Sequence, residues 1–218
     1  MFLYRRVVAV ALLLAACGGE SPGPLDPSPT PVATSITLSP TSLSFASVDD
    51  TASLVPTVKD ANDNTIPSPT VTWATSAEGV ATVSSAGLVP AIANGSAPIT
   101  ATSGSVNATA TATVSQVAAT VEIAPPSLAF STVGATATLS ATVEDAGGNE
   151  ISGATVAWTT SDSTIATVSD AGLVTSVADG TATLTATSGA ASDTASVTVL
   201  QVAASLELSD TVLSFSTL

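Results

Sequence analysis

The chain repeats itself with a period of 85 residues. Residues 32–116 and 117–201 align without a gap and agree at 42 of 85 positions. Aromatic residues mark the period: Phe45, Phe130 and Phe215 at one position, Trp73 and Trp158 at another. A fixed period of this size predicts one small structural unit used repeatedly. We therefore expect two similar modules, each with its own core, in place of one larger domain.

A third copy of the repeat begins after the second. Residues 202–218 agree with residues 117–133 at 8 of 17 positions. One strand pair is marginally stable in water, so we expect this segment to be the truncated start of a third module, and the chain to be a fragment of a longer protein. The junctions at Gln116 and Gln201 leave almost no linker, which favours an elongated, semi-rigid rod.

The repeat has the sequence pattern of an all-β sandwich. Short runs, such as residues 51–58 and 108–114, alternate apolar and polar side chains, which is typical of half-buried strands. Pro40 is expected to break the first strand, which resumes on a neighbouring path at Leu43. Glycine and Asx residues mark the turns, with Gly87 and Gly172 expected in the left-handed conformation. No segment of the repeats has helical periodicity with caps.

Four aromatic side chains are expected in the cores of the modules: Phe45, Phe130, Trp73 and Trp158. Each is far larger than the Ala, Val, Thr and Ser residues that dominate the repeat, and aromatic residues make up only 3% of the chain. The alternative role for the tryptophans is a platform on which a sugar ring stacks. That role requires exposed rings, whereas both tryptophans lie in mid-strand between apolar neighbours.

Two acidic turns are weak candidates for Ca²⁺ binding. Asp60 and Asp63 lie in the first turn, and Asp145 lies in the equivalent turn of the second module. Ca²⁺ prefers six to eight oxygen ligands, but the spacing is not that of an EF-hand loop. Asp63 is also replaced by Gly148 in the second copy. Solvated turns are the simpler interpretation, and Ca²⁺ binding stays open.

Composition excludes several kinds of site. The chain has 17 acidic residues and three basic ones, so its field repels nucleic acid, and no nucleic-acid partner is expected. It has no histidine, and Cys17 is its one cysteine, which excludes zinc sites built from Cys and His. No nucleophile elbow or phosphate-binding loop is present. We expect no enzyme activity, no catalytic residue and no cofactor.

The N-terminus has the pattern of a secretory leader. Arg5 and Arg6 precede an apolar stretch at residues 7–16, which is too short to span a bilayer as a helix and fits a signal peptide. The sequence Leu-Ala-Ala-Cys that ends at Cys17 resembles a bacterial lipobox. The resemblance implies cleavage after residue 16, acylation of Cys17 and a lipid anchor in the cell envelope. A plain signal peptide with a bystander cysteine is the alternative.

Residues 17–31 form the expected tether between this anchor and the first module. Five prolines fall between positions 22 and 31, and such spacing favours extended polyproline II structure. Gly18 follows the cysteine. In lipoproteins of envelopes with two membranes an Asp at that position tends to retain the protein on the inner membrane, so the resemblance implies the outer membrane or the cell surface.

The repeat resembles the bacterial Ig-like group 2 (Big2) family. The resemblance is carried by the runs at residues 70–76, 80–89 and 95–104, with counterparts at 156–161, 165–174 and 180–189. It implies tandem Ig-like β-sandwiches on a bacterial surface, with domains at 32–116 and 117–201. Members of the family serve adhesion, carbohydrate binding or spacing, and the family has no common catalytic residue.

These observations lead to three hypotheses on function. The first is a non-catalytic envelope lipoprotein whose modules act in surface adhesion by binding a carbohydrate or a protein. The second is a structural stalk that presents a C-terminal binding or enzymatic domain. The third is a periplasmic-facing scaffold without a partner.

Overall fold

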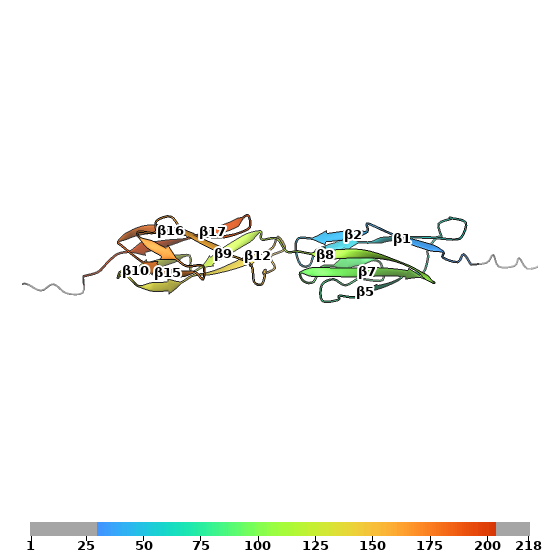
Figure 1. The fold of residues 1–218 in the computed structure, drawn as a ribbon, viewed down its shortest axis with the longest axis horizontal. Helices are drawn as coiled ribbons and strands as arrows, with labels where there is room; N and C mark the ends of the chain where they lie inside the picture. Colours follow the sequence, from blue (N-terminus) through green and yellow to red (C-terminus); the bar gives the residue numbers. More distant parts are fainter. Residues whose placement is uncertain (1–29, 204–218) are drawn as a thin grey trace, which may run out of the picture. The chain divides into compact units, whose positions relative to one another are not determined.

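A computed structural model describes residues 30–203 of the chain. The expected signal peptide, Cys17, nearly all of the tether and nearly all of the third repeat, including Phe215, lie outside the described residues. By its internal contacts the chain divides into residues 1–31 and residues 32–218, and both sandwiches belong to the second unit. All regular structure described is β-strand (Figure 1).

The first module contains strands β1 to β8. Their bounds are β1 Ser35–Ser39, β2 Ser42–Phe45, β3 Thr51–Ser53, β4 Val55–Lys59, β5 Thr72–Thr75, β6 Leu88–Pro90, β7 Gly95–Ser103 and β8 Val106–Val114. One sheet has the order β2-β8-β7-β5, while β1 pairs with β4 and β3 pairs with β6. All of these pairs are antiparallel except β2 with β8, which is parallel.

The second module repeats this arrangement with one more strand. Its strands are β9 Thr120–Ala124, β10 Ser127–Phe130, β11 Thr136–Thr138, β12 Ser140–Glu144, β13 Ala157–Thr160, β14 Ala166–Val168, β15 Leu173–Ser176, β16 Gly180–Ser188 and β17 Ala191–Val199. The sheets have the orders β10-β17-β16-β13, β12-β9 and β11-β15-β14. In the first module, a single bridge between Ala81 and Ala91 stands in place of the β14–β15 pair. The predicted fold of two tandem all-β sandwich modules is confirmed.

The first strand of each module changes sheet at a proline. Before Pro40, β1 pairs antiparallel with β4, and after it β2 pairs in parallel with β8. Proline has no backbone N–H to give to a sheet ladder. The predicted break and its continuation on a neighbouring path are thus confirmed. The alternating run at residues 51–58 is also divided, because β3 pairs with β6 whereas β4 pairs with β1. Between them, the Leu54 N–H donates to the Gly87 carbonyl at 2.9 Å and extends the register of β3 with β6.

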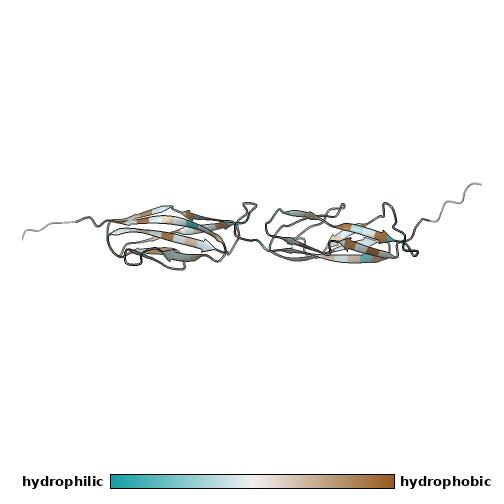
Figure 2. Cartoon of the chain, turned by 90° about the horizontal axis from the view of Figure 1, so that it is seen from above, coloured by the Kyte–Doolittle hydropathy of each residue, from teal (hydrophilic) through white to brown (hydrophobic). Residues whose placement is uncertain are grey.

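Each module encloses its own apolar core. The long strands β7, β8, β16 and β17 alternate buried and exposed residues, and brown and pale segments alternate along many strands in Figure 2. Phe45 and Phe130 are buried at 6% and 8% exposure. Trp73 and Trp158 are partly buried and pack against the two cores. The two tryptophans therefore contact the cores without being fully buried.

The turn glycine Gly87 is required by a close approach. Its φ of 80° lies in the left-handed region, as the sequence predicts. A Cβ atom at this position would lie 2.5 Å from the Leu54 carbonyl oxygen and 3.0 Å from the Trp73 ring. Gly172 has the same conformation, with φ of 74°. These glycines let the turn close over the tryptophan and fix the start of β6 and β15.

Candidate functional site

The acidic turns follow equivalent strands in the two modules. The turn Asp60–Asn64 follows β4, and the turn Asp145–Asn149 follows β12. In both turns the aspartate accepts hydrogen bonds from backbone N–H groups two and four residues ahead. This Asx-turn geometry explains why Asp and Asn stand at these positions. The turns differ in what else the carboxylate contacts.

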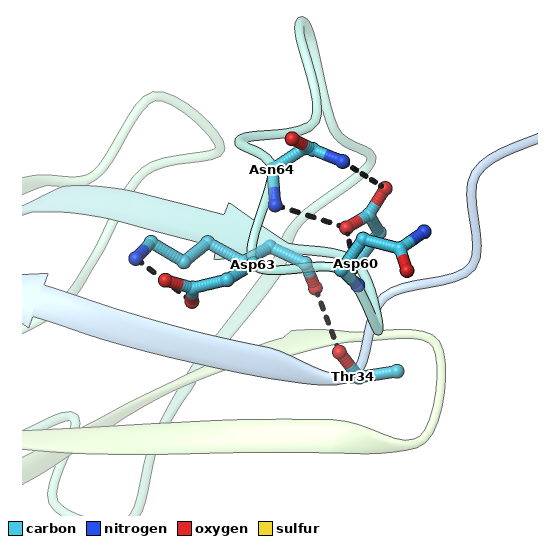
Figure 3. A network of polar contacts seen from close by, with 6 residues as sticks. Thr34, Asp60, Asp63 and Asn64 are labelled. Carbon is cyan, nitrogen blue, oxygen red and sulfur yellow. Dashed lines mark hydrogen bonds and ion pairs between the residues drawn. The ribbon is translucent and has the colours of Figure 1, made fainter.

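In the first turn, the carboxylate contacts only groups of its own turn among the described residues. Asp60 Oδ1 accepts from the N–H groups of Asn62 at 2.8 Å and Asn64 at 3.0 Å, and Oδ2 accepts from Asn64 Nδ2 at 3.3 Å. Figure 3 shows the Asn64 side chain directed at this carboxylate. The pKa of Asp60 is lowered, mainly by the hydrogen bond from the Asn64 backbone N–H. An ion pair of 3.0 Å joins Lys59 to the exposed Asp63.

In the second turn, the carboxylate is buried and bonded to both modules. Asp145 is 2% exposed, and its Oδ1 accepts from the N–H groups of Gly147 at 2.9 Å and Asn149 at 3.0 Å. Its Oδ2 accepts from the Val48 N–H and from Gln116 Nε2, both at 2.9 Å. Burial alone raises the pKa of a carboxyl group, but these four donors lower the pKa of Asp145 to about 2. It is therefore ionised at neutral pH.

Two amide side chains extend this contact into a network. Asn94 Oδ1 accepts from the Gln116 N–H at 2.7 Å, and Asn94 Nδ2 donates to Gln116 Oε1 at 3.1 Å. This pairing directs Gln116 Nε2 at Asp145. Asn149 Nδ2 donates to the Val48 carbonyl at 3.1 Å. We call Val48, Asn94, Gln116, Asp145 and Asn149 the junction network.

A glycine lets the second turn approach the first module. A Cβ atom on Gly147 would lie 2.9 Å from Asn149 Nδ2, 3.2 Å from Asp145 Oδ1 and 3.4 Å from the Val48 carbonyl oxygen. Asn62 occupies the equivalent position in the first turn, whose residues 61–65 are exposed. The exchange of Asn62 for Gly147 therefore coincides with a difference in packing: the first turn is exposed, and the second turn packs against the first module.

The structure does not bring the three Ca²⁺ candidates together. Asp60 and Asp63 belong to one turn and Asp145 to the other, and residues 30–203 contain no cluster of three or more metal-ligating His, Cys, Asp or Glu side chains. The Asp145 oxygens each accept two hydrogen bonds from protein donors. A cation at Asp145 would have to displace donors that already satisfy the carboxylate.

An open depression of about 520 Å³ lies beside the junction network. Both modules contribute to its lining, which consists of Val48, Ile92, Ala93, Asn94, Gln116, Asn149, Glu150 and Ser152. Ile92 is 42% exposed, so the depression combines an apolar contact with amide and carboxylate groups. Such a surface suits a polar ligand with an apolar face better than a purely apolar one.

Sequence reasoning found Asp145 but missed its role. It identified the residue as a turn aspartate, and it identified Gln116 as the last residue of the repeat. The exchange of Asn62 for Gly147 was the available signal, because a glycine gained in one copy of a repeat indicates a close backbone approach. Val48 takes part through its backbone N–H and carbonyl, and Asn149 through its side-chain amide. These groups do not form a recognisable sequence motif.

No helix among residues 30–203 has the length and apolarity needed to cross a bilayer. The predicted lipidation residue, Cys17, lies outside the described residues.

Comparison with known proteins identifies the repeat. The family model described as bacterial Ig-like domain (group 2) matches residues 32–114 and again residues 117–199. No curated protein matches the chain.

Several solved structures resemble the chain. Domains 1–6 of the surface layer protein SbsC are 23% identical, with a TM-score of 0.40, over 80% of this chain and 29% of that one. The Yersinia pseudotuberculosis adhesin InvE is 15% identical, with a TM-score of 0.37, over 75% and 58% of the two chains. Human protocadherin-24 EC1-2 is 13% identical, with a TM-score of 0.34, over 79% and 100%. The chain thus spans less than a third of the SbsC structure.

Proposed function

Because the chain belongs to the bacterial Ig-like domain (group 2) family, we propose that it is a non-catalytic protein of the cell envelope whose tandem modules act as a structural stalk. The contact at Asp145 carries this proposal. A buried carboxylate of the second module accepts hydrogen bonds from Val48 and Gln116 of the first. Pulling the modules apart would replace these hydrogen bonds by bonds to water, and a hydrogen bond to a charged group favours the docked state by about 1.5–3 kcal/mol. The junction is therefore stiffer than a flexible linker.

The N-terminus supports attachment of this stalk to a membrane. The lipobox-like sequence before Cys17 implies an acylated N-terminus, and more than one acyl chain is needed for stable anchoring. The proline-rich residues 17–31 would hold the first module away from the lipid surface. The proposed location is the outer membrane or the cell surface, with the stalk presenting the binding or enzymatic domain joined to it.

The stalk role is tested by the reach of a tag. An epitope is fused after Leu218, and its labelling by an antibody is measured on intact cells. We expect strong labelling with the full chain and much weaker labelling when residues 117–201 are deleted. Cys17→Ser is the control for anchoring, and it should release the protein from the membrane fraction. Equal labelling with and without the repeat would contradict the stalk role.

Adhesion is the second candidate function, and the depression beside the junction favours it. The exposed Ile92 and the surrounding amides offer a surface for a carbohydrate or a protein. Ile92→Asp should abolish any binding seen on glycan arrays or matrix proteins. Val177→Asp is the matched control, because Val177 occupies the same position of the second module and is 40% exposed. Binding that survives Ile92→Asp would exclude this depression as the site.

A further inference from the structure

Asn94 of the junction network is followed by a glycine that the fold requires. Gly95 begins β7 with a φ of 147°, and a Cβ atom there would lie 2.8 Å from Val80 Cγ2. Its counterpart Gly180 has a φ of 146°, so both modules need glycine at this position. Among the asparagines of the chain, Asn94 is the one that precedes a glycine.

This pair of residues can react without an enzyme. Asparagine is one of the thermolabile residues of proteins, and a following glycine favours the reaction because it has no Cβ to shield its backbone nitrogen. The Gly95 nitrogen attacks Asn94 Cγ and forms a cyclic imide. The Cγ–Nδ2 bond breaks, and Nδ2 leaves as ammonia with the proton of the Gly95 N–H. Water then opens the ring at either carbonyl, which restores the N–H and gives aspartate or isoaspartate at position 94.

The docked junction restrains the side chain that reacts. Asn94 and Gly95 are exposed, so water reaches both. The Asn94 amide, however, is held by Gln116, since Oδ1 accepts from the Gln116 N–H at 2.7 Å and Nδ2 donates to Gln116 Oε1 at 3.1 Å. Gln116 Nε2 is held in turn by Asp145 at 2.9 Å. Separation of the modules removes this last bond and leaves the Asn94 amide freer to turn toward the Gly95 nitrogen.

The product changes the hydrogen bonds at the junction. An ionised aspartate at position 94 has only acceptors. It still accepts from the Gln116 N–H, as Asp179 accepts from the Gln201 N–H at 2.8 Å in the second module, but it has no donor for Gln116 Oε1. The Gln116 amide is then drawn to turn Nε2 toward the new carboxylate and away from Asp145. The junction would thereby lose one of the donors that hold the Asp145 carboxylate.

We propose that Asn94 is a site of spontaneous deamidation through Gly95, and that this modification loosens the junction between the modules. The change runs in one direction, because the released ammonia does not restore the amide. A chain that opens and reacts therefore keeps a weaker junction. The covalent step depends on Asn94 and Gly95 alone, whereas its effect rests on the docked junction of the proposed stalk.

The covalent step is tested on the full chain by incubation at mildly alkaline pH, digestion at acid pH, and mass spectrometry that locates each converted asparagine. In the Asp145→Ala variant, we expect Asn94 to convert at least about tenfold faster than the exposed Asn107, which precedes an alanine. Isoaspartate beside aspartate identifies the cyclic intermediate. In the unmodified chain, conversion of Asn94 should be about threefold slower than in the variant.

Two results would overturn this part of the proposal. Conversion of Asn94 no faster than that of Asn107 would exclude the modification site. Equal rates at Asn94 in the unmodified chain and in Asp145→Ala would exclude its restraint by the junction.

The effect on the junction is read from hydrogen exchange at the Val48 N–H, which donates to Asp145. We expect Asn94→Asp to speed this exchange about tenfold. Asn107→Asp is the matched control, because it adds the same charge at the other end of the β7–β8 pair, and it should leave the exchange unchanged. Equal exchange in Asn94→Asp and in the unmodified chain would overturn the loosening. Failure of the stalk proposal is seen separately, as an unprotected Val48 N–H in the unmodified chain.

Discussion

At the scale of single residues, Asp60 and Asp145 occupy the same position of the repeat and make the same Asx turn. They differ in the hydrogen bonds of the second carboxylate oxygen. Asp60 Oδ2 accepts from Asn64 of its own turn, whereas Asp145 Oδ2 accepts from two residues of the first module. The same residue type is therefore a local turn former in the first module and a link between modules in the second.

The pKa of Asp145 gives a first prediction. Its folded value of about 2 lies below the ordinary 3.8, so ionisation favours the docked junction at pH values above about 4. This contribution is lost as the pH falls from about 4 through 2. We expect the NMR shift of the Val48 amide to titrate with a midpoint near pH 2, and the Asp145→Asn variant to lack this transition. A midpoint at or above the ordinary value would contradict the contact.

Gly147 gives a second prediction at the same scale. Its φ is outside the left-handed region, so alanine is compatible with the local backbone, but the added Cβ would press on Asn149 Nδ2 at 2.9 Å. We expect Gly147→Ala to speed hydrogen exchange at Val48 about tenfold while both cores stay folded. The matched control is Asn62→Ala in the exposed first turn. An equal effect of both variants would show that the contact does not depend on Gly147.

At the scale of elements, the small side chains of the long strands leave the cores dependent on a few large residues. The tryptophan of β5 packs against the core of its module and lies under Gly87. We expect Trp73→Ala to lower the free energy of unfolding of the first module by about 3 kcal/mol, since truncation leaves a cavity and exposes the turn. Amide exchange resolved by module measures this effect, with the second module as the internal reference. An unchanged first module would show that the ring adds little to its core.

Much of this element structure could be predicted from the sequence. The sheet change at Pro40 and the left-handed Gly87 follow from the chemistry of proline and glycine, which is local. The division of the run at residues 51–58 could not be predicted, because it depends on a change of partner strand, from β6 for β3 to β1 for β4, that exists only in the folded sandwich. Residues 81–83 and β14 both read Ala-Thr-Val, so the sequence of these residues could not predict that β14 forms a strand while Ala81 forms a single bridge.

At the scale of the whole molecule, the period of 85 residues predicts two modules but not their connection. The absence of a linker at Gln116 indicated a short junction. The hydrogen bonds that join the modules, however, involve backbone groups of Val48 and a turn 97 residues away. Such a contact depends on how two folded modules meet. Gly147 signals a close backbone approach in the second turn, but the local sequence does not show which residues the turn approaches. The sequence therefore predicted the acidic turns as separate features, and the structure shows that the second turn forms the contact between the modules.

The central claim is that the Asp145 contact fixes the two modules to one another. It is tested most directly by residual dipolar couplings of the backbone amides in weakly aligned full-length protein. We predict that one alignment tensor fits the couplings of residues 32–116 and 117–201 together, and that two different tensors are needed after Asp145→Ala. Two independent tensors in the unmodified chain would contradict the claim.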